Sequence, residues 1–104
     1  MDIKVTKNNG ELTVALTGRL DTLTSPELEE ILEEEIDDAQ KLILDLSAVK
    51  YISSAGIRVL LGAYRAMEEK DGVLLRRPSD KVMEVLDLTG LTDAFEIEQY
   101  DNDE

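Results

Sequence analysis

The spacing of apolar residues changes repeatedly along this 104-residue chain, and no other feature of the sequence restricts its fold so strongly. Apolar and polar residues alternate at positions 3–5 and 12–17, and this alternation predicts two strands. Asn9-Gly10 lies between them and favours a tight turn, because both residues tolerate a positive φ. The chain is therefore expected to begin with an antiparallel hairpin.

Helical and strand-like patterns then follow one another along the chain. Three stretches place apolar residues three or four positions apart, as one face of a helix requires, and each begins beside Ser or Pro. Two short apolar runs and one last mixed segment are typical of strands. The predicted helices begin near residues 24–27, 53–56 and 78–79, and the predicted strands lie at 42–44, 73–75 and 94–97.

The first helix and the strand after it carry specific local signals. Thr24 and Glu27 have the spacing of a capping box, and Ser25 is a rival cap for the same helix. The continuous apolar run Leu42-Ile43-Leu44 is typical of a strand that is covered on both faces. Asp45-Leu46-Ser47 is expected to end that strand.

Helices between successive strands imply right-handed crossovers and therefore parallel strands, with the first strand as an antiparallel edge. The predicted fold class is α/β, with a four- to five-stranded, mixed but mostly parallel sheet packed against about three helices. One domain is expected to span residues 1–104. The last four residues, 101–104, include no apolar side chain, so a mobile acidic tail is expected at about 100–104.

The composition excludes several classes of function. The sequence has no Cys and no His, so it cannot build a Ser-His-Asp triad, a thiol nucleophile or a usual zinc site. We therefore expect no catalytic residue, no metal and no cofactor. A net charge of −13 disfavours nucleic acid and anionic membranes, and it favours a partner with a basic surface. The first residues lack the pattern of a signal peptide, and no apolar stretch approaches the roughly 20 residues of a membrane span, so the cytoplasm is the expected compartment.

Ser53-Ser54-Ala55-Gly56 is the stretch most suggestive of a function. It joins an apolar segment to an amphipathic helix, so the simplest interpretation makes one serine the helix cap. The same position tolerates an added phosphate, because the start of a helix favours negative charge. The small residues Ala55 and Gly56 are expected to leave room for a partner or a kinase at the backbone. A nucleophilic Ser54 is disfavoured, because no neighbouring residue supplies the base.

The chain resembles the anti-sigma-factor antagonists, which carry the STAS domain. The resemblance covers nearly the whole sequence and depends on four segments in the same order as in that family. These segments are Leu16-Thr17-Gly18-Arg19-Leu20-Asp21, Leu42-Ile43-Leu44-Asp45-Leu46-Ser47, Tyr51-Ile52-Ser53-Ser54-Ala55-Gly56-Ile57-Arg58-Val59-Leu60 and Val85-Leu86-Asp87-Leu88-Thr89-Gly90-Leu91.

The resemblance implies partner switching. In that family the unphosphorylated antagonist binds an anti-sigma factor that is also a serine-protein kinase, phosphorylation releases the antagonist, and a phosphatase resets it. The family motif Asp-Ser-Ser/Thr-Gly places the phosphorylated serine at Ser54, with Ser53 in the position of the Asp and as the second choice of acceptor. The partner-binding residues implied by the match are Asp21, Ser53, Ser54, Ala55, Gly56 and Arg58.

Other interpretations of the same residues remain open at this level. In one of them the chain is a constitutive interaction module in a signalling complex, and Ser54 serves only as the helix cap. A transporter's cytoplasmic domain is disfavoured, because the sequence holds no membrane segment. The partner, the process regulated and the oligomeric state are not specified by the sequence.

Overall fold

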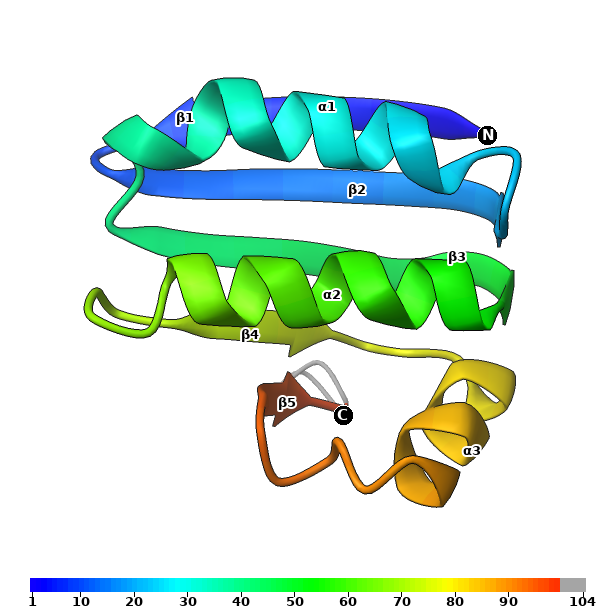
Figure 1. Ribbon diagram of the computed structural model, residues 1–104. Coiled ribbons are helices and arrows are strands. Elements are labelled where there is room, and N and C mark those ends of the chain that lie inside the picture. Colours follow the sequence, from blue (N-terminus) through cyan, green and yellow to red (C-terminus); the bar gives the residue numbers. More distant parts are fainter. Residues whose placement is uncertain (100–104) are drawn as a thin grey trace.

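The computed structural model describes residues 1–99, and it contains one sheet with helices between its parallel strands. The prediction of a mobile tail at 100–104 lies outside the described residues. Figure 1 shows two long helices side by side across one face of the sheet, with a third, shorter helix near its lower edge. In chain order the elements are β1 (Asp2–Asn8), β2 (Glu11–Leu20), α1 (Ser25–Glu35), a 3-10 turn (Ile36–Asp38), β3 (Lys41–Ile52), α2 (Ser54–Ala66), β4 (Val73–Arg76), α3 (Asp80–Leu88) and β5 (Glu96–Glu98).

The sheet has five strands, and their spatial order is their order in the chain. Strands β1 and β2 pair antiparallel, and every later pair is parallel, so the predicted mixed and mostly parallel sheet is confirmed. The hairpin prediction is also confirmed: Asn9 and Gly10 have φ values of 54° and 85°. Positive φ at two successive residues matches the twist of the strands that such a turn joins.

A single apolar cluster lies between the sheet and the helices. Alternate residues of the central strands point into it, and α1 and α2 contribute the facing side chains. Strand β3 is buried at all three positions of 42–44, as predicted. Leu42 and Leu44 belong to the main cluster, whereas Ile43 lies outside that cluster and is 4% exposed.

The predicted end of β3 at Asp45-Leu46-Ser47 is wrong, because the strand continues to Ile52. Its pairing with β2 is interrupted rather than lost, since β3 advances by three residues where β2 advances by two. The Asp45 side chain bonds the backbone and hydroxyl of Ser47 at this bulge, at 3.0 and 2.7 Å. Asp45 and Ser47, which predicted the end of the strand, instead form a bulge within it.

The predicted caps of α1 are also wrong. Thr24 precedes the helix, but its side chain makes no cap hydrogen bond. Its hydroxyl instead donates to the carbonyl oxygen of Arg19 at 2.7 Å and accepts from the N–H of Asp21 at 2.9 Å. Ser25 is the first helical residue, and its hydroxyl is buried without a hydrogen-bond partner in the described chain. The Thr24 side chain therefore forms its hydrogen bonds within the turn before α1 and does not cap the helix.

Candidate functional site

The predicted site residues lie where the carboxyl ends of β2 and β3 meet. The register places Arg19 beside Tyr51 and Leu20 beside Ile52, and the N–H of Ser53 donates to the carbonyl oxygen of Leu20 at 2.9 Å. Because the two strands are parallel, the segments that follow them leave from the same edge of the sheet. The structure therefore brings the turn that holds Asp21 next to the start of α2.

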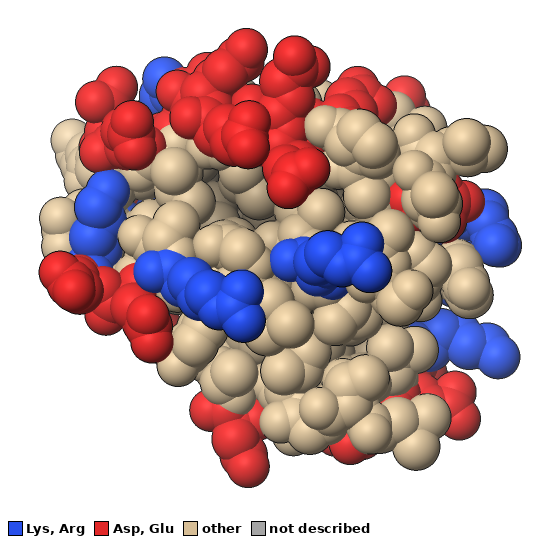
Figure 2. Space-filling model, viewed as in Figure 1, with Lys and Arg blue, Asp and Glu red and all other residues tan. Residues whose placement is uncertain are grey.

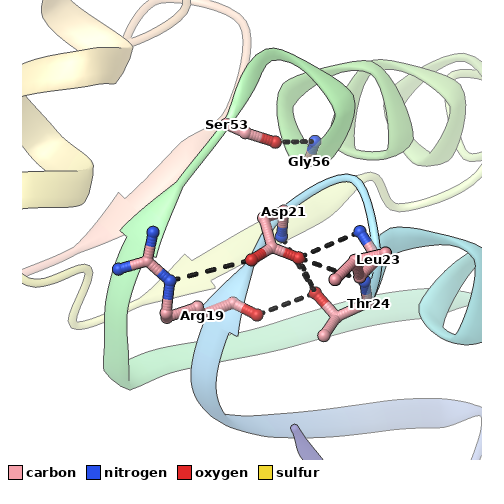
Figure 3. Close-up of polar contacts among 6 residues, drawn as sticks. All are labelled: Arg19, Asp21, Leu23, Thr24, Ser53 and Gly56. Atoms are coloured by element: carbon pink, nitrogen blue, oxygen red, sulfur yellow. Dashed lines mark hydrogen bonds and ion pairs between the residues drawn. The ribbon is translucent and has the colours of Figure 1, made fainter.

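The two serines at the start of α2 have different environments. Ser53 precedes the helix with extended backbone angles, φ −98° and ψ 177°, and its hydroxyl oxygen accepts from the N–H of Gly56 at 3.4 Å (Figure 3). Ser54 is the first helical residue, and its side chain is exposed. The alternative in which Ser54 is the helix cap is wrong, since Ser53 occupies that position.

Gly56 holds the start of α2 against the sheet. It is buried, and a Cβ atom at this position would lie 2.7 Å from Ile52 Cγ1 and 3.0 Å from the carbonyl oxygen of Leu20. Such distances are shorter than van der Waals contact, so only glycine fits without a shift of the neighbours. The expectation that Gly56 leaves room for a partner is wrong, because side chains of this chain fill the space. Ala55, by contrast, is partly exposed.

Asp21 organises the neighbouring turn. Its Oδ1 accepts hydrogen bonds from the backbone N–H groups of Leu23, at 3.0 Å, and Thr24, at 3.2 Å (Figure 3). Partial burial acts to raise the pKa of Asp21, but the bonds from Thr24 and Leu23 and the charge of Arg19 outweigh it and hold that pKa below its ordinary value. Asp21 is therefore a fixed anion beside the start of α2.

Arg19 and Tyr51 add a cationic and aromatic element that the sequence did not assign to the site. The Arg19 guanidinium carbon lies 4.3 Å from the centre of the Tyr51 ring, and Arg19 Nε lies 3.7 Å from Asp21 Oδ2. Both side chains are exposed. Only the parallel pairing of β2 with β3 brings them together, so no local signal in the sequence identified the pair.

A cavity of about 240 Å³ lies between the first turns of α1 and α2. Arg58 borders it from α2, and Glu29 borders it from α1. Figure 2 shows the surrounding surface, where acidic side chains gather over α1 and basic side chains lie over α2. The residues that line the cavity are Thr22, Ser25, Pro26, Glu29, Ala55, Arg58 and Val59.

Two further findings concern residues 1–99. Acidic side chains do not converge there in a group of three or more that would hold a metal ion. None of the helices in this part of the chain combines the length and the apolar character that a bilayer span requires.

Several known proteins are similar to this chain in sequence and in fold. An anti-sigma-B factor antagonist from Staphylococcus aureus is 29% identical to this chain, with 95% of this chain and 94% of the relative aligned. The crystal structure of an anti-sigma factor antagonist from Mycobacterium paratuberculosis is 26% identical and superposes with a TM-score of 0.87, over 98% of this chain and 88% of that one. Unphosphorylated SpoIIAA, an anti-sigma factor antagonist, is 20% identical with a TM-score of 0.81, over 92% of this chain and 87% of that one, and it shares the fold.

The family profile of the STAS domain matches residues 2–102, which is nearly the whole chain. Relatives named as anti-sigma-B factor antagonists also occur in Listeria monocytogenes and Bacillus subtilis, at 27% and 28% identity. By homology the chain is therefore related to regulatory proteins. It belongs to the STAS domain family, and it is homologous to proteins named as anti-sigma factor antagonists.

Proposed function

We propose that this chain is an anti-sigma factor antagonist that acts by partner switching in the cytoplasm. The unphosphorylated form binds an anti-sigma factor that is also a serine-protein kinase. Phosphorylation of Ser54 releases the chain, and a phosphatase restores the unphosphorylated form. In this scheme the chain is the substrate of the modification and does no chemistry of its own.

The exposed hydroxyl of Ser54 is the observation that carries the proposal. Ser53 supplies the helix cap, so a phosphate on Ser54 costs no cap hydrogen bond. The first turn of α2 also favours the added negative charge, because its unpaired N–H groups and the helix dipole are positive at that end. Homology to named anti-sigma-B factor antagonists supports the kind of partner.

The surface around Ser54 supports recognition by a protein. Arg58 is exposed four residues further along the same helix, and Arg19 and Tyr51 are exposed near the ends of β2 and β3. Arginine and tyrosine are enriched in the centres of protein interfaces. Asp21 supplies a fixed negative charge in the same region. A partner that docks here would meet the phosphate directly. Within a partner surface that is otherwise expected to be basic, two added negative charges would repel an acidic group that faces Arg58, and the phosphate would disrupt the packing there.

The first experiment is phosphosite mapping by mass spectrometry on the chain recovered from its own cells, together with a Ser54→Ala form. Phosphate at Ser54 that disappears in Ser54→Ala is the expected result. Ser54→Asp is expected to weaken binding to the anti-sigma factor that copurifies with the parent chain, while Ser54→Ala retains it. Ser53→Ala is the matched control, because it removes the adjacent hydroxyl and leaves the acceptor in place.

A contrary result would identify the alternative. If the chain is never phosphorylated at Ser54 and binds its partner equally well with Ser54→Asp, it is a constitutive STAS interaction module. Ser53 supplies the specific reason for this alternative, since it stands where the family motif has Asp. Phosphate at Ser53 alone would move the switch by one residue.

A further inference from the structure

Arg58 is an exposed arginine near the start of α2 in a strongly acidic chain. The chain carries 24 acidic residues and 11 basic ones. Within residues 1–99 Arg58 forms no ion pair, although it is exposed and borders the same cavity as Glu29 of α1. The ion pairs that do form are Lys7–Glu35, Arg19–Asp21, Lys41–Glu96, Arg76–Glu98 and Arg77–Asp45.

The position of Arg58 in α2 relates it to Ser54. The two residues are four apart within one continuous helix, Ser54–Ala66, so they are neighbours on one face. A helical side chain extends over the turn that precedes it, which directs Arg58 toward the start of the helix. Arg58 also borders the open cavity between α1 and α2, which gives its guanidinium room to change direction.

We propose that Arg58 is the intramolecular receptor for a phosphate on Ser54. A phosphoserine carries nearly two negative charges and three strong acceptor oxygens, and a guanidinium offers a planar pair of donors that matches them. The inference rests on the proposed function, because it states how the phosphate at that same site is held. The pair would stay within the first turns of α2 and would add to the favourable field of the helix N-terminus.

This pairing gives phosphorylation a second effect on the partner. In the unphosphorylated chain the guanidinium of Arg58 is available to a carboxylate of the partner. In the phosphorylated chain the same guanidinium is occupied by the phosphate. The modification therefore adds an anion to the docking surface and withdraws a cation from it, two changes that act in the same direction on an acidic group of the partner.

Glu29 is the acidic residue that competes for Arg58. It borders the same cavity from α1, and it has no ion pair in the described part of the chain. A phosphate has the advantage over Glu29 because it carries about twice the charge and lies on the same helix as Arg58. Glu29→Gln is therefore expected to leave the phosphate pairing intact.

The test uses the full chain with phosphoserine installed at position 54 during synthesis, so that no kinase is required. Phosphorus NMR then follows the second ionisation of the phosphate with pH. Arg58 favours the dianion, so Arg58→Gln is expected to raise the proton affinity of the phosphate about threefold. Arg65→Gln is the matched control: it is exposed on the same helix, but about 16 Å from Ser54 along the helix axis.

Each outcome has one meaning. A threefold change with Arg58→Gln and none with Arg65→Gln supports the pairing. Equal titration curves for the parent chain and Arg58→Gln overturn it, as does a fall in phosphate proton affinity with Glu29→Gln that is as large as the rise expected for Arg58→Gln. A failure of the proposed function is seen separately, as an absence of phosphate at Ser54 in cells, and it leaves this titration unchanged.

Discussion

The turns that lead into α1 and α2 occupy equivalent places at the ends of neighbouring parallel strands, yet they use small polar residues in opposite ways. In the turn before α1, Asp21 and Thr24 bond to each other and to the surrounding backbone. In the turn before α2, the N–H of Gly56 donates one long hydrogen bond to the Ser53 hydroxyl, and Ser54 is exposed. The side chains of the first turn are bonded within that turn, whereas the second turn leaves the Ser54 side chain exposed.

The difference shows how a fold can expose a serine side chain while the backbone beneath it stays closely packed. Packing rather than hydrogen bonding holds the start of α2, because Gly56 lies against Leu20 and Ile52. The neighbouring turn is held by Asp21, which keeps Arg19 and the end of β2 in place. In the proposed function, a phosphate on Ser54 would therefore leave the atoms that position this residue buried or bonded.

The largest expected effect tests the packing of α2. Gly56→Ala should lower the free energy of unfolding by about 2 kcal/mol, because the new methyl group overlaps Ile52 and Leu20. Gly62→Ala is the matched control on the same helix: its Cβ would meet no atom within 4 Å, and it should raise stability by roughly 0.5–1 kcal/mol. Urea unfolding of both forms measures the contrast. Equal effects of the two substitutions would show that the start of α2 is not held by close packing.

A smaller effect tests the closed turn. Asp21→Ala should lower the urea midpoint at neutral pH by less than Gly56→Ala does, because the carboxylate is partly exposed and screened. The folded pKa of Asp21 is depressed, so its stabilisation is full above the ordinary value of about 3.9 and is lost as pH falls through the folded pKa. The difference in urea midpoint between the parent chain and Asp21→Ala should therefore become smaller from pH 6 to pH 2.5. A constant gap would mean that the ionised carboxylate does not hold the turn.

The smallest effect separates the two adjacent serines. Ser53→Ala should cost about 0.5–1 kcal/mol through loss of the helix cap, and Ser53→Asp should restore that stability. Ser54→Ala should change stability by less than about 0.5 kcal/mol, because its exposed side chain makes no cap bond. Thermal unfolding of the three forms provides the comparison. The assignment of the cap to Ser53 fails if Ser54→Ala is the more costly substitution.

Much of the fold followed from local patterns in the sequence. Asn9-Gly10 identified the hairpin because its two residues adopt the positive φ values that the turn requires. The periods of the apolar residues identified the alternation of helices and strands. The end of β3 did not follow, because Asp45 and Ser47 form a bulge that depends on continued pairing with β2. The sequence of one strand alone does not show how that strand pairs with another strand that is distant in the chain.

The site was harder to predict than the fold. The resemblance selected Ser53 and Ser54, but only backbone angles decide which of two serines caps a helix. The role of Gly56 depends in part on contact with Leu20 of β2, which lies more than thirty positions away in the sequence. Arg19 stood within a matched motif, yet its contact with Tyr51 depends on the same parallel pairing. Residue types were therefore predictable, and their neighbours were not.

The agreement between spatial and chain order in the sheet has a consequence for biosynthesis. Each strand after β1 pairs with the strand made just before it, so the growing sheet always offers its newest edge to the next strand. Connections of this kind close short loops first, which favours rapid folding. A chain emerging from the ribosome would hold both turns of the site as soon as α2 is complete. The region that we propose as the partner-binding surface would thus be assembled before β4 and β5 are made.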